Sequence, residues 1–207
     1  MAADYDVPPS SRVTAELWIA CMRSGPIRGG LRSRRWHTNA IWLVHEIGRL
    51  SPCASILDVG CGEGSLTQYV TGFARETVGI DVSGVAIERA RRAVPRGTFH
   101  RVRLEDFEPE RRFSVVLAVE VLYYVRSVAD ALRRLMSFGD HVLVSYTSRE
   151  RDRIEPYVEP YGDTRSRRFY PFFESTKFGF TVAHLRADRA DGCVSALSAA
   201  AEFGDKR

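Results

Sequence analysis

A glycine-rich segment that directly follows a short apolar run constrains the fold of this chain most. Residues 54–59 (ASILDV) have the composition of a buried parallel strand, and glycine then occupies every second position from Gly60 to Gly64. Glycine reaches backbone angles that other residues avoid and lets a ligand approach the main chain closely. A glycine loop between a strand and a helix therefore predicts a ligand site at the end of the first strand.

Strand-like and helix-like segments alternate after this loop. We expect helices at 65–73, from Ser83 to 94 and from Ser127 to 136, and strands at 54–59, 76–81, 98–103, 113–119, 141–146, 181–187 and 193–199. Such alternation is typical of an α/β fold with a doubly wound, mostly parallel sheet, here seven-stranded and Rossmann-like.

The two ends of the chain are less regular. Helical spacing at 11–22 and 34–50 predicts an N-terminal helical cap, 149–170 is polar and irregular, and 171–178 has a helical pattern. A length of 207 residues favours a single domain. We divide it into the cap (1–50), a cofactor-binding core (51–148) and an acceptor-side segment with the last strands (149–207).

Composition excludes several classes of protein. No apolar run is long enough to span a membrane, and the N-terminal ten residues lack the features of a signal peptide, so we expect a cytoplasmic protein. The four cysteines (Cys21, Cys53, Cys61 and Cys193) have no metal-ligand spacing, which predicts no metal site. Thirty Lys and Arg against 26 Asp and Glu give a net charge of +4, carried almost wholly by scattered arginines. Nucleic acid is therefore the least favoured partner.

Two acids distinguish the classes of cofactor. The loop has the spacing G-x-G-x-G rather than the G-x-G-x-x-G of dinucleotide-binding proteins. Asp81, at the end of the second predicted strand, can accept hydrogen bonds from both hydroxyls of a ribose. Asp58, just before the glycines, would repel a pyrophosphate and attract an ammonium group. Together they favour S-adenosylmethionine over NAD.

The segments DVGCGEG and GIDVS resemble motif I and the following motif of class I methyltransferases, over about 56–146. The resemblance implies that the loop of Gly60, Cys61 and Gly62 holds the methionine part of the cofactor. It also implies that Asp81 binds the ribose and that Val82 lies beside the adenine. For the adenine amino group it leaves two acids open, Glu105 and Asp106, which in one register stand in for an acid whose usual position is occupied by Arg103.

The sequence after the fourth predicted strand, E-V-L-Y-Y from Glu120 to Tyr124, is similar to that of the nodulation protein S (NodS) family, as are 35–38 and 191–194. That resemblance implies N-methylation of an amino sugar. We expect Glu120 to lie beside the cofactor and the forming positive charge, Tyr124 to line the acceptor pocket, and His37 to accept a proton.

Other functions stay open at this point. O-methylation of a small-molecule hydroxyl or carboxylate, methylation of RNA through arginine clusters, and a non-catalytic role with a decayed site are the alternatives to N-methylation of a small amine. The sequence is compatible with a homodimer as well as with a monomer.

Overall fold

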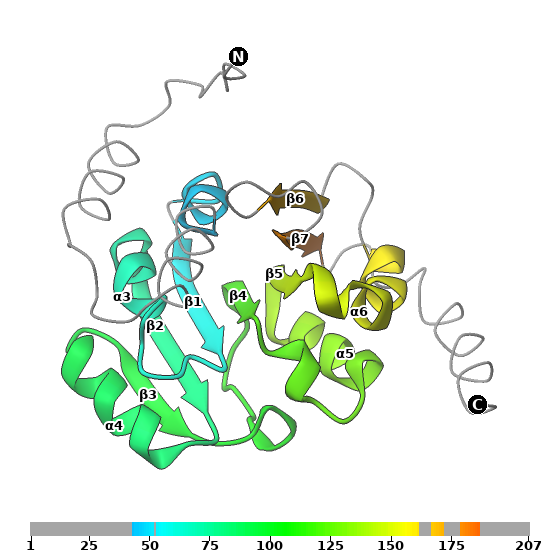
Figure 1. The fold of residues 1–207 in the computed structure, drawn as a ribbon. Coiled ribbons are helices and arrows are strands. Elements are labelled where there is room, and N and C mark those ends of the chain that lie inside the picture. The colour runs from blue at the N-terminus through cyan, green and yellow to red at the C-terminus, as the bar shows by residue number, and fades with distance from the viewer. Residues whose placement is uncertain (1–42, 52, 162–166, 172–178, 187–207) are drawn as a thin grey trace.

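The structure, a computed structural model, describes residues 43–51, 53–161, 167–171 and 179–186. Seven strands form one sheet in the order β3-β2-β1-β4-β5-β7-β6 (Figure 1). The first five strands in this order form four parallel pairs, whereas β7 pairs antiparallel with both β5 and β6. The predicted seven-stranded, mostly parallel α/β sheet is confirmed.

The strands follow the apolar segments of the sequence. Their bounds are β1 (Cys53–Val59), β2 (Ala74–Asp81), β3 (Thr98–Arg101), β4 (Phe113–Val119), β5 (Gly139–Thr147), β6 (Arg167–Pro171) and β7 (Gly179–Arg186). The central strands β1 and β4 are buried along nearly their whole length, as expected for parallel strands covered on both faces.

Alternate residues of β4 pack on opposite faces of the sheet, because side chains along a strand alternate in direction. Val116 and Ala118 belong to a core formed with α5 (Val128–Phe138) and α6 (Arg151–Val158). Val115 and Leu117 belong to a second core formed with the helix at 43–48 and α3 (Thr67–Val70). The sheet is therefore covered on both faces.

Serine caps begin two of the helices where they were expected. The Ser83 hydroxyl accepts a hydrogen bond from the Ala86 amide at the start of α4 (Gly84–Ala93), and the Ser127 hydroxyl accepts one from the Asp130 amide at the start of α5, both at 3.2 Å. Such caps satisfy amides that have no partner within the helix. The remaining elements are 3₁₀ turns: η1 (Thr71–Phe73), η2 (Leu104–Asp106), η3 (Leu122–Tyr124), η4 (Ser148–Glu150) and η5 (Glu159–Tyr161).

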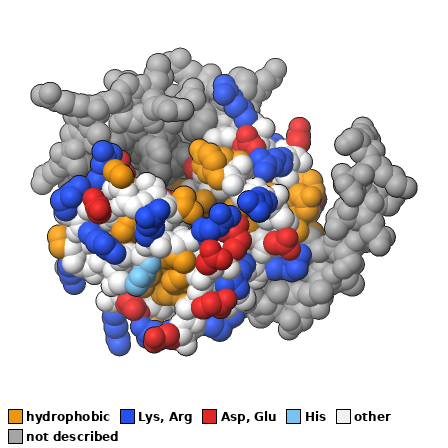
Figure 2. All heavy atoms as spheres, turned by 90° about the horizontal axis from the view of Figure 1, so that it is seen from below, with side chains coloured by type: hydrophobic (Ala, Val, Ile, Leu, Met, Phe, Trp, Pro, Cys, Tyr) orange, Lys and Arg blue, Asp and Glu red, His pale blue; other side chains and the backbone are white. Residues whose placement is uncertain are grey.

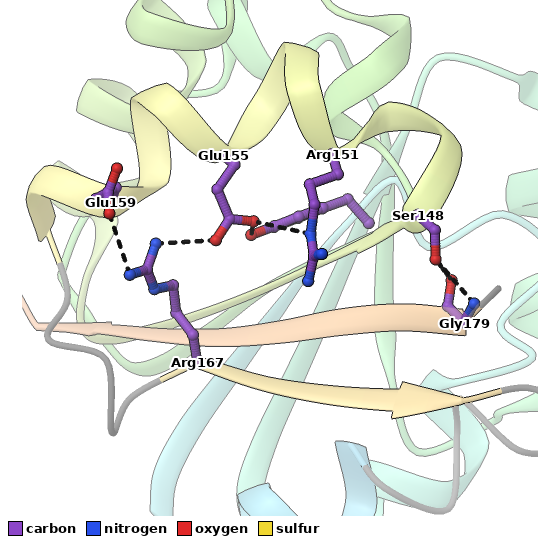
Figure 3. Close-up of polar contacts among 7 residues, drawn as sticks. Ser148, Arg151, Glu155, Glu159, Arg167 and Gly179 are labelled. Atoms are coloured by element: carbon purple, nitrogen blue, oxygen red, sulfur yellow. Dashed lines mark hydrogen bonds and ion pairs between the residues drawn. The ribbon is translucent and has the colours of Figure 1, made fainter. Parts of the chain in front are cut away.

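The expectation of an irregular segment at 149–170 is wrong, because this segment contains α6 and most of β6. A polar network holds the two elements together (Figure 3). The guanidinium of Arg167 in β6 donates to the carboxylates of Glu155 (2.9 Å) and Glu159 (3.4 Å), and Glu155 also accepts the Tyr146 hydroxyl at 2.5 Å. Polar contacts of this kind leave no apolar periodicity in the sequence.

Several expectations fall outside the described residues: the helices at 11–22 and 34–42, the segment 172–178, and the strand at 193–199. Pro171, expected to begin a helix, is instead the last residue of β6. In the described part of the chain, no helix has the length and apolar character that crossing a bilayer requires.

Candidate functional site

A cleft of about 500 Å³ opens where β1, β2, β3 and β4 end. Figure 2 views the molecule from this end, to which the arrowheads of β1 and β2 point in Figure 1, and charged side chains of both signs surround apolar ones there. The residues that line the cleft come from the segments following these strands: Val59, Gly60, Ile80, Asp81, Val82, Val102, Arg103, Leu104, Glu105, Glu120, Val121, Tyr124 and Val125. Ligands of open α/β sheets bind at this edge.

The glycine loop borders the cleft at Gly60, directly after β1. Gly60, Gly62 and Gly64 all have positive φ angles, of 72°, 54° and 81°. A Cβ on Gly60 would meet Cγ2 of Val121 at 2.6 Å, so the close approach of the two loops requires glycine there. The loop is tied to the neighbouring strand, because the amides of Gly60 and Cys61 donate to the carbonyl of Ile80 at 2.8 and 3.0 Å.

Asp81 is the last residue of β2, and its carboxylate is hydrogen-bonded to the glycine loop. Its Oδ2 accepts a hydrogen bond from the Gly62 amide at 3.0 Å, and its Oδ1 accepts one from the Ser83 amide at 2.8 Å. Each carboxylate oxygen can accept a second hydrogen bond. Asp81 therefore keeps free acceptor capacity for two neighbouring hydroxyls, such as those of a ribose.

Asp58 directly precedes the loop and Cys61 belongs to it, and neither of them, nor Gly62, is among the described residues that line the cleft. The buried Asp58 carboxylate accepts the Thr67 hydroxyl at 2.7 Å. Burial raises the pKa of Asp58 to about 7, with the Thr67 hydrogen bond opposing and the Asp81 carboxylate adding to the rise. Burial likewise raises the pKa of the Cys61 thiol, which packs among Ile87 and other apolar residues of α4 and β3.

The segment after β3 brings charges of both signs to the cleft. Arg103 and Glu105 line it, and Nε of Arg103 donates to Glu105 at 3.4 Å. Hydrogen bonding to its own backbone amide lowers the pKa of Glu105, and the Arg103 and Arg126 guanidinium groups add to this after a smaller opposing effect of burial. Asp106 lines a neighbouring pocket instead. Of the two predicted acids, Glu105 is thus the one at the cleft, and Arg103 lies there with it.

Glu120 follows β4 with a φ of 56°, and it is the one residue other than glycine with a positive φ in the described part of the chain. Its Oε1 accepts the Ser145 hydroxyl and its Oε2 accepts the Tyr123 hydroxyl, both at 3.0 Å. Burial raises the pKa of Glu120, the two hydroxyl hydrogen bonds oppose this, and the Glu150 carboxylate adds to it. Backbone strain of this kind is concentrated at functional sites.

The two adjacent tyrosines have different surroundings. Tyr123 is half-buried, whereas the side chain of Tyr124 is 80% exposed and lines the cleft. Their ring centroids lie 4.6 Å apart. Of the predicted catalytic residues, Glu120 and Tyr124 therefore share the cleft, and His37 lies outside the described residues.

Two hydrogen-bond partners of Glu120 were not predicted from the sequence: the hydroxyl of Ser145 and the hydroxyl of Tyr123. One signal for Ser145 was available, because it is a lone polar residue within the apolar run of β5 and is fully buried. A buried hydroxyl needs a hydrogen-bond partner. The partner, Glu120, could not be identified without the pairing of β4 with β5.

The charged side chains that line the cleft determine which charge a bound ligand can carry. Three carboxylates (Asp81, Glu105 and Glu120) line it with one guanidinium, that of Arg103. This balance fits a ligand with a positive charge and disfavours a pyrophosphate. Val82, which is 63% exposed at the rim, offers an apolar surface to a flat ring. The described residues include no group of three or more His, Cys, Asp or Glu that could hold a metal ion.

Comparison with known proteins identifies the family of the chain. A family model described as a methyltransferase domain matches residues 33–180. The chain therefore belongs to the methyltransferase domain family, and the resemblance predicted from the glycine loop is confirmed.

The relatives with assigned names methylate different atoms. The chain is 28% identical over 95 residues to dTDP-3-amino-3,4,6-trideoxy-alpha-D-glucopyranose N,N-dimethyltransferase of Streptomyces venezuelae, covering 45% of this chain and 40% of that protein. It is 34% identical over 138 residues to ubiquinone biosynthesis O-methyltransferase of Rhodopseudomonas palustris (62% and 54%), and 30% identical over 101 residues to nodulation protein S of Rhizobium tropici (44% and 42%). The chain spans about half the length of the curated relatives it matches.

Solved structures share the fold. N-methyltransferase NodS from Bradyrhizobium japonicum WM9, in complex with S-adenosyl-L-homocysteine, superposes with a TM-score of 0.61 at 16% identity, over 85% of this chain and 98% of that one. Magnesium protoporphyrin IX methyltransferase from Synechocystis PCC 6803 superposes with a TM-score of 0.59 at 13% identity, over 87% and 100%. The NodS-like architecture predicted from the sequence is thus confirmed.

Proposed function

We propose that this chain is an S-adenosylmethionine-dependent methyltransferase that methylates the amine nitrogen of a small molecule, such as an amino sugar or a related natural product. The observation that carries the proposal is the set of three carboxylates around the cleft, joined to a glycine loop with positive φ angles. These features suit an adenosine that bears a sulfonium and an amino acid group, and family membership supports the same chemistry.

The cofactor would be held by the residues at the ends of β1, β2 and β3. The loop from Gly60 to Gly62 faces the methionine part, the free acceptor sites of Asp81 bind the ribose hydroxyls, and Val82 packs beside the adenine. Glu105 accepts a hydrogen bond from the adenine amino group. When bound, the cofactor supplies a methyl group on a positively charged sulfur.

The acceptor side must mainly align the nucleophile and exclude water, since transfer of a methyl group is an in-line displacement. Glu120 stabilises the positive charge that forms on the acceptor nitrogen, and Tyr124 lines the acceptor pocket. An ammonium must lose a proton before its nitrogen can attack, and His37 accepts that proton.

O-methylation is the second candidate, because relatives from Rhodopseudomonas palustris at 34% identity are named as O-methyltransferases. A hydroxyl acceptor carries no charge for a fixed carboxylate to attract, whereas an alkylamine acceptor is an ammonium at neutral pH. Glu120 at the cleft therefore favours nitrogen over oxygen.

Calorimetry with S-adenosylhomocysteine tests the cofactor assignment. We expect binding that Asp81→Ala abolishes and that the matched variant of an exposed acid, Asp140→Ala, leaves unchanged. If the folded wild-type protein does not bind the compound, the methyltransferase proposal fails.

Mass spectrometry tests the acceptor class. Purified protein is incubated with S-adenosylmethionine and pairs of amino sugars and their hydroxy analogues. A methylated product from the amines alone supports N-methylation, a product from the hydroxy compounds alone overturns it in favour of O-methylation, and methyl incorporation only into RNA overturns the small-molecule assignment.

A further inference from the structure

The carboxylate of Glu120 is held at both of its oxygens by residues that have no role in the proposal above. The left-handed backbone of Glu120 is unfavourable for a residue with a Cβ, because the Cβ approaches the carbonyl oxygen. A conformation of this kind persists only where the surroundings enforce it. The hydrogen bonds of Glu120 with its neighbours therefore enforce this conformation.

Ser145 binds Glu120 at two points. Its carbonyl accepts the Glu120 amide at 3.1 Å, and its hydroxyl donates to Oε1 of Glu120 at 3.0 Å. Ser145 is fully buried in β5, beside Val119, the last residue of β4. Packing alone would favour an apolar residue at this position of the sheet, so the hydroxyl serves Glu120.

Tyr123 holds the other oxygen. Its hydroxyl donates to Oε2 of Glu120 at 3.0 Å. Burial raises the pKa of Tyr123, and the neighbouring Glu120 carboxylate adds to this, so the phenol keeps its proton. The tyrosine is fixed in turn by Arg153 of α6, which donates to the carbonyls of Tyr123 (3.0 Å) and Val125 (3.3 Å).

We propose that Ser145 and Tyr123 are positioning residues that hold the Glu120 carboxylate ionised and in one orientation, so that the site selects a cationic alkylammonium acceptor over a neutral alcohol. Two hydroxyl donors stabilise a carboxylate more than a carboxylic acid, and they oppose the larger effect of burial, which raises the pKa of Glu120. The inference rests on the proposed function, because it concerns the acceptor side of the same cleft.

The other carboxylates near Glu120 act in the same direction as Glu120 on a cationic acceptor, and the guanidinium groups oppose them. Asp81 from β2 and Glu105 from η2 line the cleft with it, and Glu150 of η4 is close enough to raise its pKa. Opposing them are the guanidinium groups of Arg103, paired with Glu105, and of Arg153, whose Nη1 lies 3.8 Å from Glu150. A cation at the cleft is therefore attracted by several carboxylates. Among those that line the cleft, Glu120 is the one whose two oxygens both accept hydrogen bonds from side-chain hydroxyls.

Carboxyl NMR of the full chain, with ¹³C-labelled glutamate, tests the positioning role. Glu120→Gln identifies the resonance by its loss. We expect the titration midpoint of Glu120 to move upward in both Ser145→Ala and Tyr123→Phe. The matched control is Tyr146→Phe, which removes a tyrosine–glutamate hydrogen bond (to Glu155) away from the cleft and should leave the midpoint unchanged. An unchanged midpoint in Ser145→Ala and Tyr123→Phe, or an equal shift in the control, overturns the positioning role.

The same resonance tests the cation selectivity. Methylammonium chloride should lower the midpoint of Glu120 relative to sodium chloride at equal ionic strength, because a bound alkylammonium favours the ionised carboxylate. Equal midpoints in the two salts overturn the selectivity.

Turnover provides the second readout. With an amine acceptor found by mass spectrometry, kcat/KM of Ser145→Ala and Tyr123→Phe should fall about tenfold each, with S-adenosylhomocysteine affinity unchanged. The NMR readout needs no methyl transfer. A protein that shows the expected titrations but binds no S-adenosylhomocysteine would therefore overturn the proposed function and leave the positioning role standing.

Discussion

Nδ1 of His141 lies 3.0 Å from Nε2 of His184, joining β5 to β7. At this distance one ring must donate and the other accept, so the pair cannot hold both protons without separating. Burial lowers the pKa of His184 to about 4, and the charge of His141 adds to this. Of the more distant groups, Glu46 opposes the shift, while Arg186 and Arg49 support it.

This pair should make the protein less stable in mild acid. The unfolded chain protonates His184 near its ordinary pKa of 6.5, whereas the folded chain does so near 4, so the unfolded state binds more protons between these values. We expect the contribution of His184 to the free energy of unfolding to fall by about 1–2 kcal/mol from pH 7 to pH 4, after allowance for solvent screening. Urea unfolding of wild type and His184→Gln at both pH values isolates this difference. His100→Gln replaces an exposed histidine and is the control, because its free energy of unfolding should keep the wild-type pH dependence. If His184→Gln also keeps the wild-type pH dependence, the prediction is wrong.

The buried Asp58 should have the opposite effect on stability. Its folded-state pKa of about 7 lies above the ordinary value of 3.8, so its favourable contribution is complete below pH 4 and is lost as the pH rises to 7. Asp58→Asn keeps an acceptor for Thr67 and removes the ionisation. We therefore expect the free energy of unfolding of Asp58→Asn, relative to wild type, to increase by about 3 kcal/mol between pH 4 and pH 8. Identical pH profiles of the two proteins, measured by urea unfolding, would contradict this.

Gly79 in β2 has no room for a side chain. A Cβ there would meet Cδ1 of Phe99 at 2.6 Å and Sγ of Cys61 at 2.9 Å. Gly79→Ala should lower the free energy of unfolding by about 1–3 kcal/mol, because a packed core resists added volume. Gly72→Ala is the control, since a Cβ at Gly72 meets nothing within 4 Å. Thermal unfolding compares the stabilities of Gly79→Ala and Gly72→Ala. Equal stabilities would contradict the prediction, because they would show that the core around Phe99 rearranges to accept the added methyl group.

Arg167 joins β6 to α6 with a side chain that is only 12% exposed. Its removal leaves the carboxylate of Glu155 without its shortest cationic contact, so Arg167→Ala should cost about 2 kcal/mol of stability. Hydrogen exchange should accelerate in 151–158 and 167–171 and stay unchanged in α4. The exposed pair of Arg133 and Asp130 provides the control, because Arg133→Ala should change stability by less than about 1 kcal/mol. Uniform acceleration across the sheet would contradict the local role of Arg167.

The sequence predicted those parts of the fold that depend on burial and on local caps. The apolar run 113–119 forms β4 over the same residues, and the serines at 83 and 127 cap α4 and α5 as expected. The segment 149–170 was missed for a physical reason. α6 buries only Ile154 and Val158, a single pair four residues apart, and contains Pro156, so its apolar pattern is too short to predict a helix.

In the candidate site, too, some features could be predicted from the sequence and others could not. The position of the glycine loop and Asp81 at the cleft could be predicted, because it follows from the order of strand, loop and helix. The contacts of Glu120 with Ser145 and Tyr123 could not, because they require the pairing of β4 with β5 and a left-handed backbone at a residue whose side chain normally disfavours it.

The strained backbone at Glu120 has a consequence for engineering. Glycine at 120 would relieve the left-handed conformation, and valine at 145 with phenylalanine at 123 would remove the hydroxyls that glutamate satisfies. Repeated selection for thermal stability alone should therefore favour such a combination and yield a more stable protein that lacks the carboxylate at the cleft. Libraries intended to increase the thermal stability of this protein should therefore keep positions 120, 123 and 145 unchanged, because a screen that measures stability alone would replace these residues first.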